Sequence, residues 1–276
     1  MVRESLARKF HPAGFEQPEG SRKNYVKPRA ELQYAFDKWV DELPVPLFDG
    51  DEEDQYKKAR ELVQPLGKIP YREANSLLIN FEPKTQEDEE EGHPVGVFIS
   101  ACYNQSSEQV IVFDLDAPEI NFIGYNLGKP KVLVNNGKAG NNFGTGNSAK
   151  FHRKPFSGFV INNGEVGYNF GAYSYGILMN NGKAGTNFGH NTSGLVMMLR
   201  NPKHYEPGIW EDCRVLELAD CDEVPELKIY VTELRELSKT VEDGESARKF
   251  IEKYGVGGKK VEPEINEILK RGGFKL

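Results

Sequence analysis

The chain has 276 residues, a formal net charge of −7 and a pI near 5.5. This length suits one large or two small domains, and the acidic balance argues against general nucleic-acid binding, which needs a basic surface. No apolar run reaches the roughly 20 residues of a membrane-spanning helix, and the polar first residues show no secretory signal, so we expect a cytoplasmic protein without a membrane segment.

The first 93 residues are predicted to form a polar arm and then a helical region. Residues 1–28 are polar and interrupted by prolines, which indicates irregular backbone. From 29 to 42 the apolar residues recur at helical spacing, and a second helix is expected from about 52 to 64. The segment 69–81 leaves helix and strand open.

An acidic run at 86–92 marks a boundary, because like charges in a row usually form a solvated loop. After it, the apolar runs 95–102 and 109–113 are predicted to be strands, with a turn at 104–107 between them. The predicted β domain covers residues 94–202.

A ten-residue phrase inside this domain occurs three times, at 135–144, 162–171 and 180–189. Each copy begins with Asn-Asn-Gly, ends with Asn-Phe-Gly and follows a short apolar run. The second and third copies start 18 residues apart, and a degenerate copy lies near 120–128, where Asn-Leu-Gly takes the place of Asn-Phe-Gly. Such a period predicts stacked coils, with equivalent strands ~4.8 Å apart.

Equivalent residues of stacked coils form ladders, so the repeated positions are interpreted as structural and not catalytic. Asn and Gly tolerate the left-handed backbone of tight turns, and stacked amides and rings add contacts along a ladder. A further ladder of Lys138, Glu165 and Lys183 alternates in sign. The positions assigned to the fold are Asn135, Gly137, Gly140, Phe143, Asn162, Gly164, Gly167, Phe170, Asn180, Gly182, Gly185 and Phe188.

The segment Gly176-Ile-Leu-Met-Asn-Asn-Gly-Lys-Ala-Gly-Thr-Asn-Phe-Gly189 resembles a Gly-rich repeat found in glutamate synthase, in the C-terminal domain of its large chain, and in formylmethanofuran dehydrogenase. The resemblance covers about residues 120–200, and Ser157, Tyr175 and Ser193 stand where that family has the first Gly of a pair. It implies a right-handed parallel β-helix that serves as a scaffold between active centres, and it carries over no catalytic residue.

The expected class is therefore mainly β with helical ends (α+β): a right-handed parallel β-helix or solenoid flanked by N- and C-terminal helices. Residues 1–93 form the arm and helical region, residues 94–202 the β-helix, and residues 203–276 a C-terminal helical region. The helical tail is expected because apolar residues trace helical faces there.

Cysteines and histidines offer little chemistry. The three cysteines show no Cys-x-x-Cys spacing, so reduced thiols are expected, and a Cys213–Cys221 bridge stays open. No two histidines stand at metal-binding spacing, and each is expected at the surface or in a turn: His11, His93, His152, His190 and His204. The sequence predicts no catalytic residue, no metal and no cofactor.

Two functions remain. The first is a non-catalytic scaffold or assembly subunit that binds a protein partner or a second copy of itself. The second is an enzyme or a binder of an anionic small molecule that uses the basic loop 145–157. That loop holds an insertion between the first two phrases, with His152, Arg153 and Lys154, and insertions in repeat proteins often lie on the binding face. His190, directly after the third phrase, is a further candidate.

Overall fold

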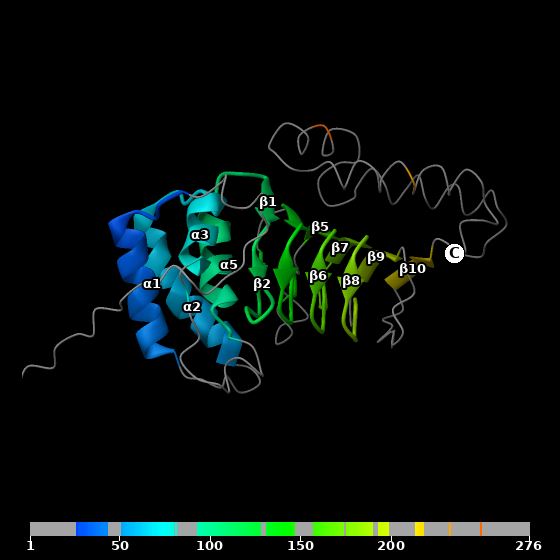
Figure 1. Cartoon of the computed structure of the whole chain (residues 1–276), viewed down its shortest axis with the longest axis horizontal. Helices are drawn as coiled ribbons and strands as arrows, with labels where there is room; N and C mark the ends of the chain where they lie inside the picture. Colours follow the sequence, from blue (N-terminus) through cyan, green and yellow to red (C-terminus); the bar gives the residue numbers. More distant parts are fainter. Residues whose placement is uncertain are drawn as a thin grey trace, which may run out of the picture.

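The computed structural model describes residues 26–43, 51–79, 81, 93–127, 131–146, 157–173, 175–189, 193–198, 213–217, 232 and 249. Along this part of the chain the helices come first and the strands follow, so that the helices gather at one end of two sheets (Figure 1). Of the predicted C-terminal helical region, the structure describes only the strand Cys213–Glu217 and the two single helical residues Thr232 and Lys249; the rest of the predicted helices lies outside the described residues.

The described N-terminal part holds four α-helices and one short 3-10 helix. They are α1 (Ala30–Glu42), α2 (Asp51–Val63), η2 (Gln64–Leu66), α3 (Tyr71–Leu78) and α5 (Gly96–Gln105). The apolar face predicted for 29–42 is buried: Phe36 and Trp39 of α1 lie 5.4 and 5.6 Å from the ring of Phe98 on α5. The indole of Trp39 also donates to the backbone oxygen of Gln55, 3.2 Å away, which joins α1 to α2.

Ten strands of the described chain make two sheets in which every pair is parallel. The six-stranded sheet contains β1 (Val110–Phe113), β3 (Val132–Asn135), β5 (Ser157–Asn162), β7 (Tyr175–Asn180), β9 (Ser193–Met198) and β10 (Cys213–Glu217), in that order. The four-stranded sheet contains β2 (Asp116–Ala117), β4 (Lys138–Ala139), β6 (Glu165–Val166) and β8 (Lys183–Ala184). We call one long strand with its following short strand and turn a layer.

The repeated phrases lie directly on top of one another. Asn135 pairs with Asn162, and Asn162 with Asn180, in the six-stranded sheet. The insertion between the first two phrases leaves this register intact. The expected stacking of the phrases is therefore observed, because equal positions in the phrase are neighbours across the layers.

The Asn-Phe-Gly end of each phrase forms a turn of left-handed backbone. Asn142, Asn169 and Asn187 have φ of 60°, 57° and 61°, a region that Asn tolerates better than most residues. The turns bring the phenylalanines into a column, with ring centroids of Phe143 and Phe170 6.2 Å apart and those of Phe170 and Phe188 4.9 Å apart. All three rings are fully buried.

The predicted fold class is wrong. The described residues form two open parallel sheets together with four α-helices, an α/β type of arrangement, and this part of the chain shows no closed or solenoid β-helix. Its α-helices hold slightly more residues than its strands, so it is not mainly β. Positive-φ turns, rather than strands, follow the short strands, because Asn and Gly at these corners bend the backbone out of an extended conformation.

Two local predictions are also corrected. The run 95–102, predicted to be a strand, lies in α5. In the first layer the turn that corresponds to Asn-Phe-Gly is Phe122-Ile123-Gly124, and not Asn126-Leu-Gly128 as predicted. The backbone shows this correspondence: Gly144 N donates to Ile123 O at 2.8 Å, just as Gly171 N donates to Phe143 O in the next layer. Phe122 has the positive φ of 65° that the later layers give to Asn.

Candidate functional site

The binding residues proposed from the sequence lie outside the described residues: His152, Arg153, Lys154 and His190. Of the other candidates, His93 is described, and it is buried and not at the surface. Its Nδ1 accepts a hydrogen bond from the Val95 amide at 3.2 Å, and its ring packs edge-on against Phe81. His93 therefore helps to hold the turn before α5.

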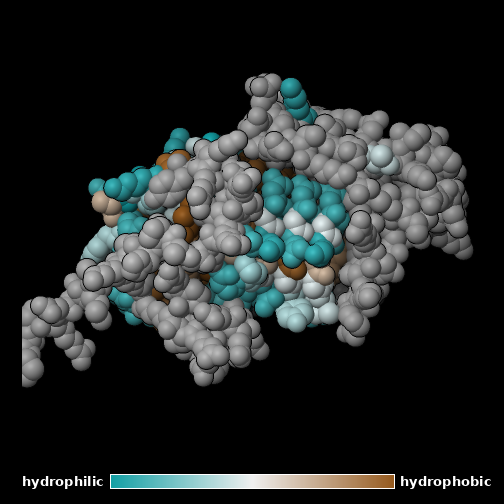
Figure 2. Space-filling view, viewed as in Figure 1, coloured by the Kyte–Doolittle hydropathy of each residue, from teal (hydrophilic) through white to brown (hydrophobic). Residues whose placement is uncertain are grey.

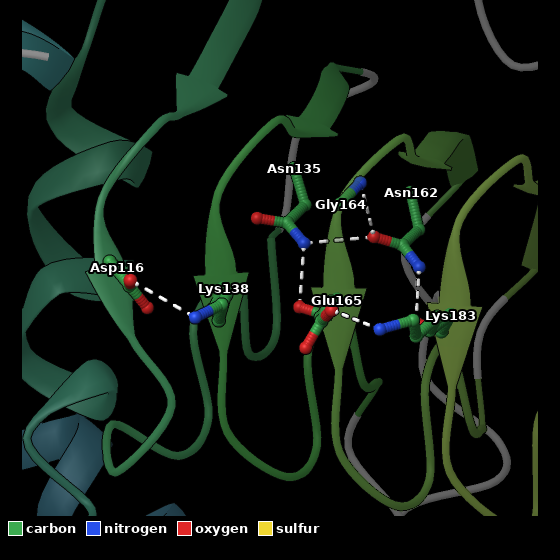
Figure 3. A network of polar contacts seen from close by, with 7 residues as sticks. All are labelled: Asp116, Asn135, Lys138, Asn162, Gly164, Glu165 and Lys183. Atoms are coloured by element: carbon green, nitrogen blue, oxygen red, sulfur yellow. Dashed lines mark hydrogen bonds and ion pairs between the residues drawn. The ribbon is translucent and has the colours of Figure 1, made fainter. Parts of the chain in front are cut away.

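The first asparagines of the phrases form a buried amide ladder. Asn135 Nδ2 donates to Asn162 Oδ1 at 2.8 Å (Figure 3). In the next layer Asn162 Nδ2 donates to Asn180 Oδ1, also at 2.8 Å. Each amide also donates to the backbone of the next layer, at Glu165 O (2.9 Å) and Lys183 O (2.8 Å). Both N–H bonds of Asn135 and of Asn162 are thus used inside the protein, so these side chains support the fold and are not offered to a ligand.

The turn glycines are fixed by the close approach of neighbouring layers. A Cβ atom at Gly137 would collide with the carbonyl oxygen of Leu115, and one at Gly164 with that of Gly137. The same collision, with the oxygen of Gly164, would occur at Gly182. These three positions thus have a packing reason for glycine, and not the left-handed backbone expected from the sequence, because none of them has a positive φ.

Four charged side chains lie in a line on the four-stranded sheet, one per layer; we call them the charged row: Asp116, Lys138, Glu165 and Lys183. Lys138 Nζ lies 3.1 Å from Asp116 Oδ2, and Lys183 Nζ lies 2.6 Å from Glu165 Oε1 (Figure 3). Along the sheet the signs are negative, positive, negative, positive. The side chains are 26%, 45%, 44% and 80% exposed in this order.

Neighbouring charges in the row stabilise one another's ionised forms. The hydrogen bond from Lys183 holds the pKa of Glu165 below its ordinary value, and Lys138 acts in the same direction. The hydrogen bond with Asp116 raises the pKa of Lys138. Glu165 and Lys138 are therefore ionised at neutral pH, and the alternating pattern is a fixed property of this face.

A second polar row runs beside the charged row. Asn163 Nδ2 donates to Asn136 Oδ1 at 2.9 Å, and Asn181 Nδ2 to Asn163 Oδ1 at 2.7 Å. Figure 2 shows hydrophilic atoms in regular lines over the region where Figure 1 draws β6 and β8. The face is therefore polar and regularly spaced.

Other buried polar groups have structural tasks. Lys131, which no pattern in the sequence singles out, is 3% exposed and donates to the backbone oxygens of Ser106 (2.9 Å) and Glu108 (2.6 Å), so it fixes the chain after α5. Burial raises the pKa of the Cys102 thiol and raises that of Tyr56 to about 12. Both groups are therefore neutral at physiological pH, which argues against a reactive thiolate at Cys102.

Within the described ranges, no group of three or more His, Cys, Asp or Glu side chains is placed to hold a metal ion. The helices of the described chain include none that is long and apolar enough to cross a membrane. Comparison with known proteins finds no matching family model, no matching curated protein and no matching solved structure. The function must therefore be argued from the surface that the repeats build.

Proposed function

We propose that this protein is a non-catalytic scaffold or assembly subunit, which binds another protein or a second copy of itself through the face of its four-stranded sheet. The charged row is the observation that carries this proposal, because four charged side chains of alternating sign are presented in register on one sheet.

Two further features support a binding role for this face. The amides of Asn135 and Asn162 are occupied inside the stack, which leaves the charged row as the group of side chains that the repeats offer to a partner. The pairing of the strands fixes the spacing of the charges along the row, so a partner with the same spacing can meet several of them at once. Complementary charges would then select the partner and its orientation.

The proposal is tested by neutralising the charged row in the full chain with Asp116→Asn, Lys138→Gln, Glu165→Gln and Lys183→Gln together. A matched control neutralises the exposed pair on α2, Asp54→Asn with Lys57→Gln, which lie 2.7 Å apart. Light scattering after size exclusion measures self-association, and cross-linking in source lysate followed by mass spectrometry measures capture of a partner.

We expect the wild type and the control to self-associate or to capture a partner protein, and the row-neutral variant to remain monomeric and to capture none. A wild type that is strictly monomeric, and that captures no protein the row-neutral variant fails to capture, would refute the proposed function. Circular dichroism of each variant shows whether the fold is retained.

The second candidate, binding of an anionic small molecule by loop 145–157, is favoured by one observation. Despite the nine extra residues between them, β3 and β5 pair in the same register as β5 and β7, so the insertion does not disturb the pairing of the described strands. Replacing His152, Arg153 and Lys154 by Ala and measuring melting temperatures with phosphate-containing ligands tests it. A ligand-dependent shift that is lost in the triple variant would establish this function.

A further inference from the structure

We infer that the partner of the charged row is a second copy of this chain, docked antiparallel on the same face, with a two-fold axis passing between Lys138 and Glu165. This inference rests on the proposed function and specifies its partner. It follows from the order of the charges along the row, because a second copy of the chain presents the same four charges in the same order.

The order of the signs is self-complementary under a two-fold rotation. Rotation reverses the row, so Asp116 of one copy faces Lys183 of the other, and Lys138 faces Glu165. By symmetry the same two pairs form again on the other side of the axis, which gives four pairs of opposite charge. An interface of this kind is isologous, because both copies use the same patch.

Other alignments of two rows are less favourable. A parallel alignment places like charges opposite each other in every layer, and like charges facing each other weaken association. A parallel alignment shifted by one layer restores opposite signs but leaves one charge of each copy without a facing partner. The antiparallel alignment is therefore the arrangement in which all charges of both rows are matched.

The spacing of the pairs is satisfied automatically. Neighbouring strands lie about 4.8 Å apart, and both copies have the same strand spacing, so all four pairs meet at the same time. The contacts within each copy do not prevent this. An ammonium group has three N–H donors and a carboxylate has about four acceptor sites, so each can hold its neighbour in the row and a facing partner as well.

The face is open to such an approach. The side chain of Lys183 is 80% exposed and that of Lys138 is 45% exposed. Figure 2 shows the hydrophilic lines of this face at the surface of the molecule. The neighbouring row of amides, Asn136, Asn163 and Asn181, keeps the surroundings of the charges polar.

The experiment uses two opposite charge reversals, Asp116→Lys and Lys183→Glu, each in the full chain. In the antiparallel dimer these positions face each other, so each single variant turns two attractive pairs into two repulsive pairs. We expect each variant alone to dimerise at least about tenfold more weakly than the wild type. When the two variants are mixed, every facing pair is again of opposite sign, and we expect a heterodimer of near wild-type affinity.

Sedimentation equilibrium of each variant and of the equimolar mixture, with one variant fluorescently labelled, measures these affinities. Matched controls carry the same changes of charge on α2: Asp54→Lys and Lys57→Glu. They are expected to dimerise like the wild type, which separates the effect of the row from that of net charge. Melting curves of all variants show that a loss of dimer is not a loss of fold.

Three results would overturn the inference. The first is a wild type that stays monomeric at high micromolar concentration. The second is a dimer that survives both reversals unchanged. The third is a mixture of the two folded variants that forms no heterodimer. If row neutralisation abolishes assembly but the mixture is not restored, the face binds protein in another arrangement; the proposed function then stands and only the antiparallel docking fails.

Discussion

Replacing Asn162 by Ala tests whether the buried amide ladder holds the layers together. Asn162 is fully buried at the centre of the ladder, where its Nδ2 donates to Asn180 Oδ1 and to Lys183 O, both at 2.8 Å. Its Oδ1 accepts from Asn135 Nδ2 at 2.8 Å and from Gly164 N at 3.1 Å. The substitution removes all four hydrogen bonds without changing the backbone.

The expected loss follows from the partners left behind. Asn135 Nδ2 keeps its bond to Glu165 O, and Gly164 N keeps one to Asn135 O. The buried Oδ1 of Asn180 and one N–H of the buried Asn135 amide lose their partner, and so does the partly buried backbone oxygen of Lys183. An unsatisfied buried group costs about 1–3 kcal/mol, so two of them lower the free energy of unfolding by about 2–6 kcal/mol.

Asn163→Ala is the matched control, because this neighbour makes the same kind of ladder on the outer face, at 2.9 and 2.7 Å. Water can replace these bonds, so a loss below about 1 kcal/mol is expected. Urea unfolding followed by circular dichroism gives both values from the midpoint at constant m. Equal destabilisation by the two substitutions would refute the ladder as a source of stability.

The remaining predictions concern the glycines, the charges and the chemistry of the repeat. Gly164→Ala forces a Cβ against the backbone oxygen of Gly137, so a loss of about 1–3 kcal/mol is expected in the same urea assay, and an unchanged midpoint would contradict the close approach. NMR titration of the Glu165 carboxyl should give a midpoint below 4.5, and Lys183→Ala should return this midpoint toward 4.5. The pair therefore stabilises the fold above pH 4.5, and this stabilisation is lost as the pH falls through the lowered pKa of Glu165. Peptide mass spectrometry should find that Asn163 deamidates more slowly in the native chain than in the urea-unfolded chain. The reason is that the Gly164 N–H, the group that attacks the Asn163 side chain, donates to Asn162 Oδ1 and Asn135 O. Equal deamidation rates would show that these hydrogen bonds give no protection.

The stacking of the phrases could be predicted because identity at fixed spacing demands identical surroundings. Asn135, Asn162 and Asn180 can all satisfy the same set of bonds only if they are neighbours in successive layers. The same reasoning predicted the phenylalanine column and the alternating charges of the later layers. Comparison of the three copies therefore indicates which residues lie next to one another, which a single copy of the phrase could not do.

The fold class and the residues of the first layer could not be predicted in the same way. The run 95–102 has no polar side to reveal its period, because Gly96 to Tyr103 of α5 are all buried. A short apolar run of this kind fits a strand or a buried helix equally well. The helical content of the N-terminal part was underestimated for this reason, and the expected mainly β class followed from it.

Asp116 shows why one member of the charged row was missed. It stands in register with Lys138, yet its layer has Phe113-Asp-Leu-Asp116 where the next has Asn135-Asn-Gly-Lys138. The degenerate copy near 120–128 marks this layer as part of the repeat, but without the Asn-Asn-Gly phrase the position of Asp116 in the layer was not recognised. The signal was the spacing of 22 residues between β1 and β3 together with the charge that completes the alternation.

The helices explain why the first layer can depart from the phrase. A parallel strand at the end of a stack exposes unpaired backbone groups, which invite further pairing unless something covers them. Here Asn75 of α3 donates to the backbone oxygen of Val112 in β1 at 2.8 Å, while its own oxygen accepts from the hydroxyl of Tyr103 in α5. In the turn after β2, Ser100 of α5 donates to the oxygen of Phe122 at 2.9 Å. Side chains of the helices, which lie beside the first layer (Figure 1), thus bond to backbone oxygens of that layer. The first layer is thus selected to fit the helices, and only the later layers are selected to fit one another, which is why the phrase begins at the second.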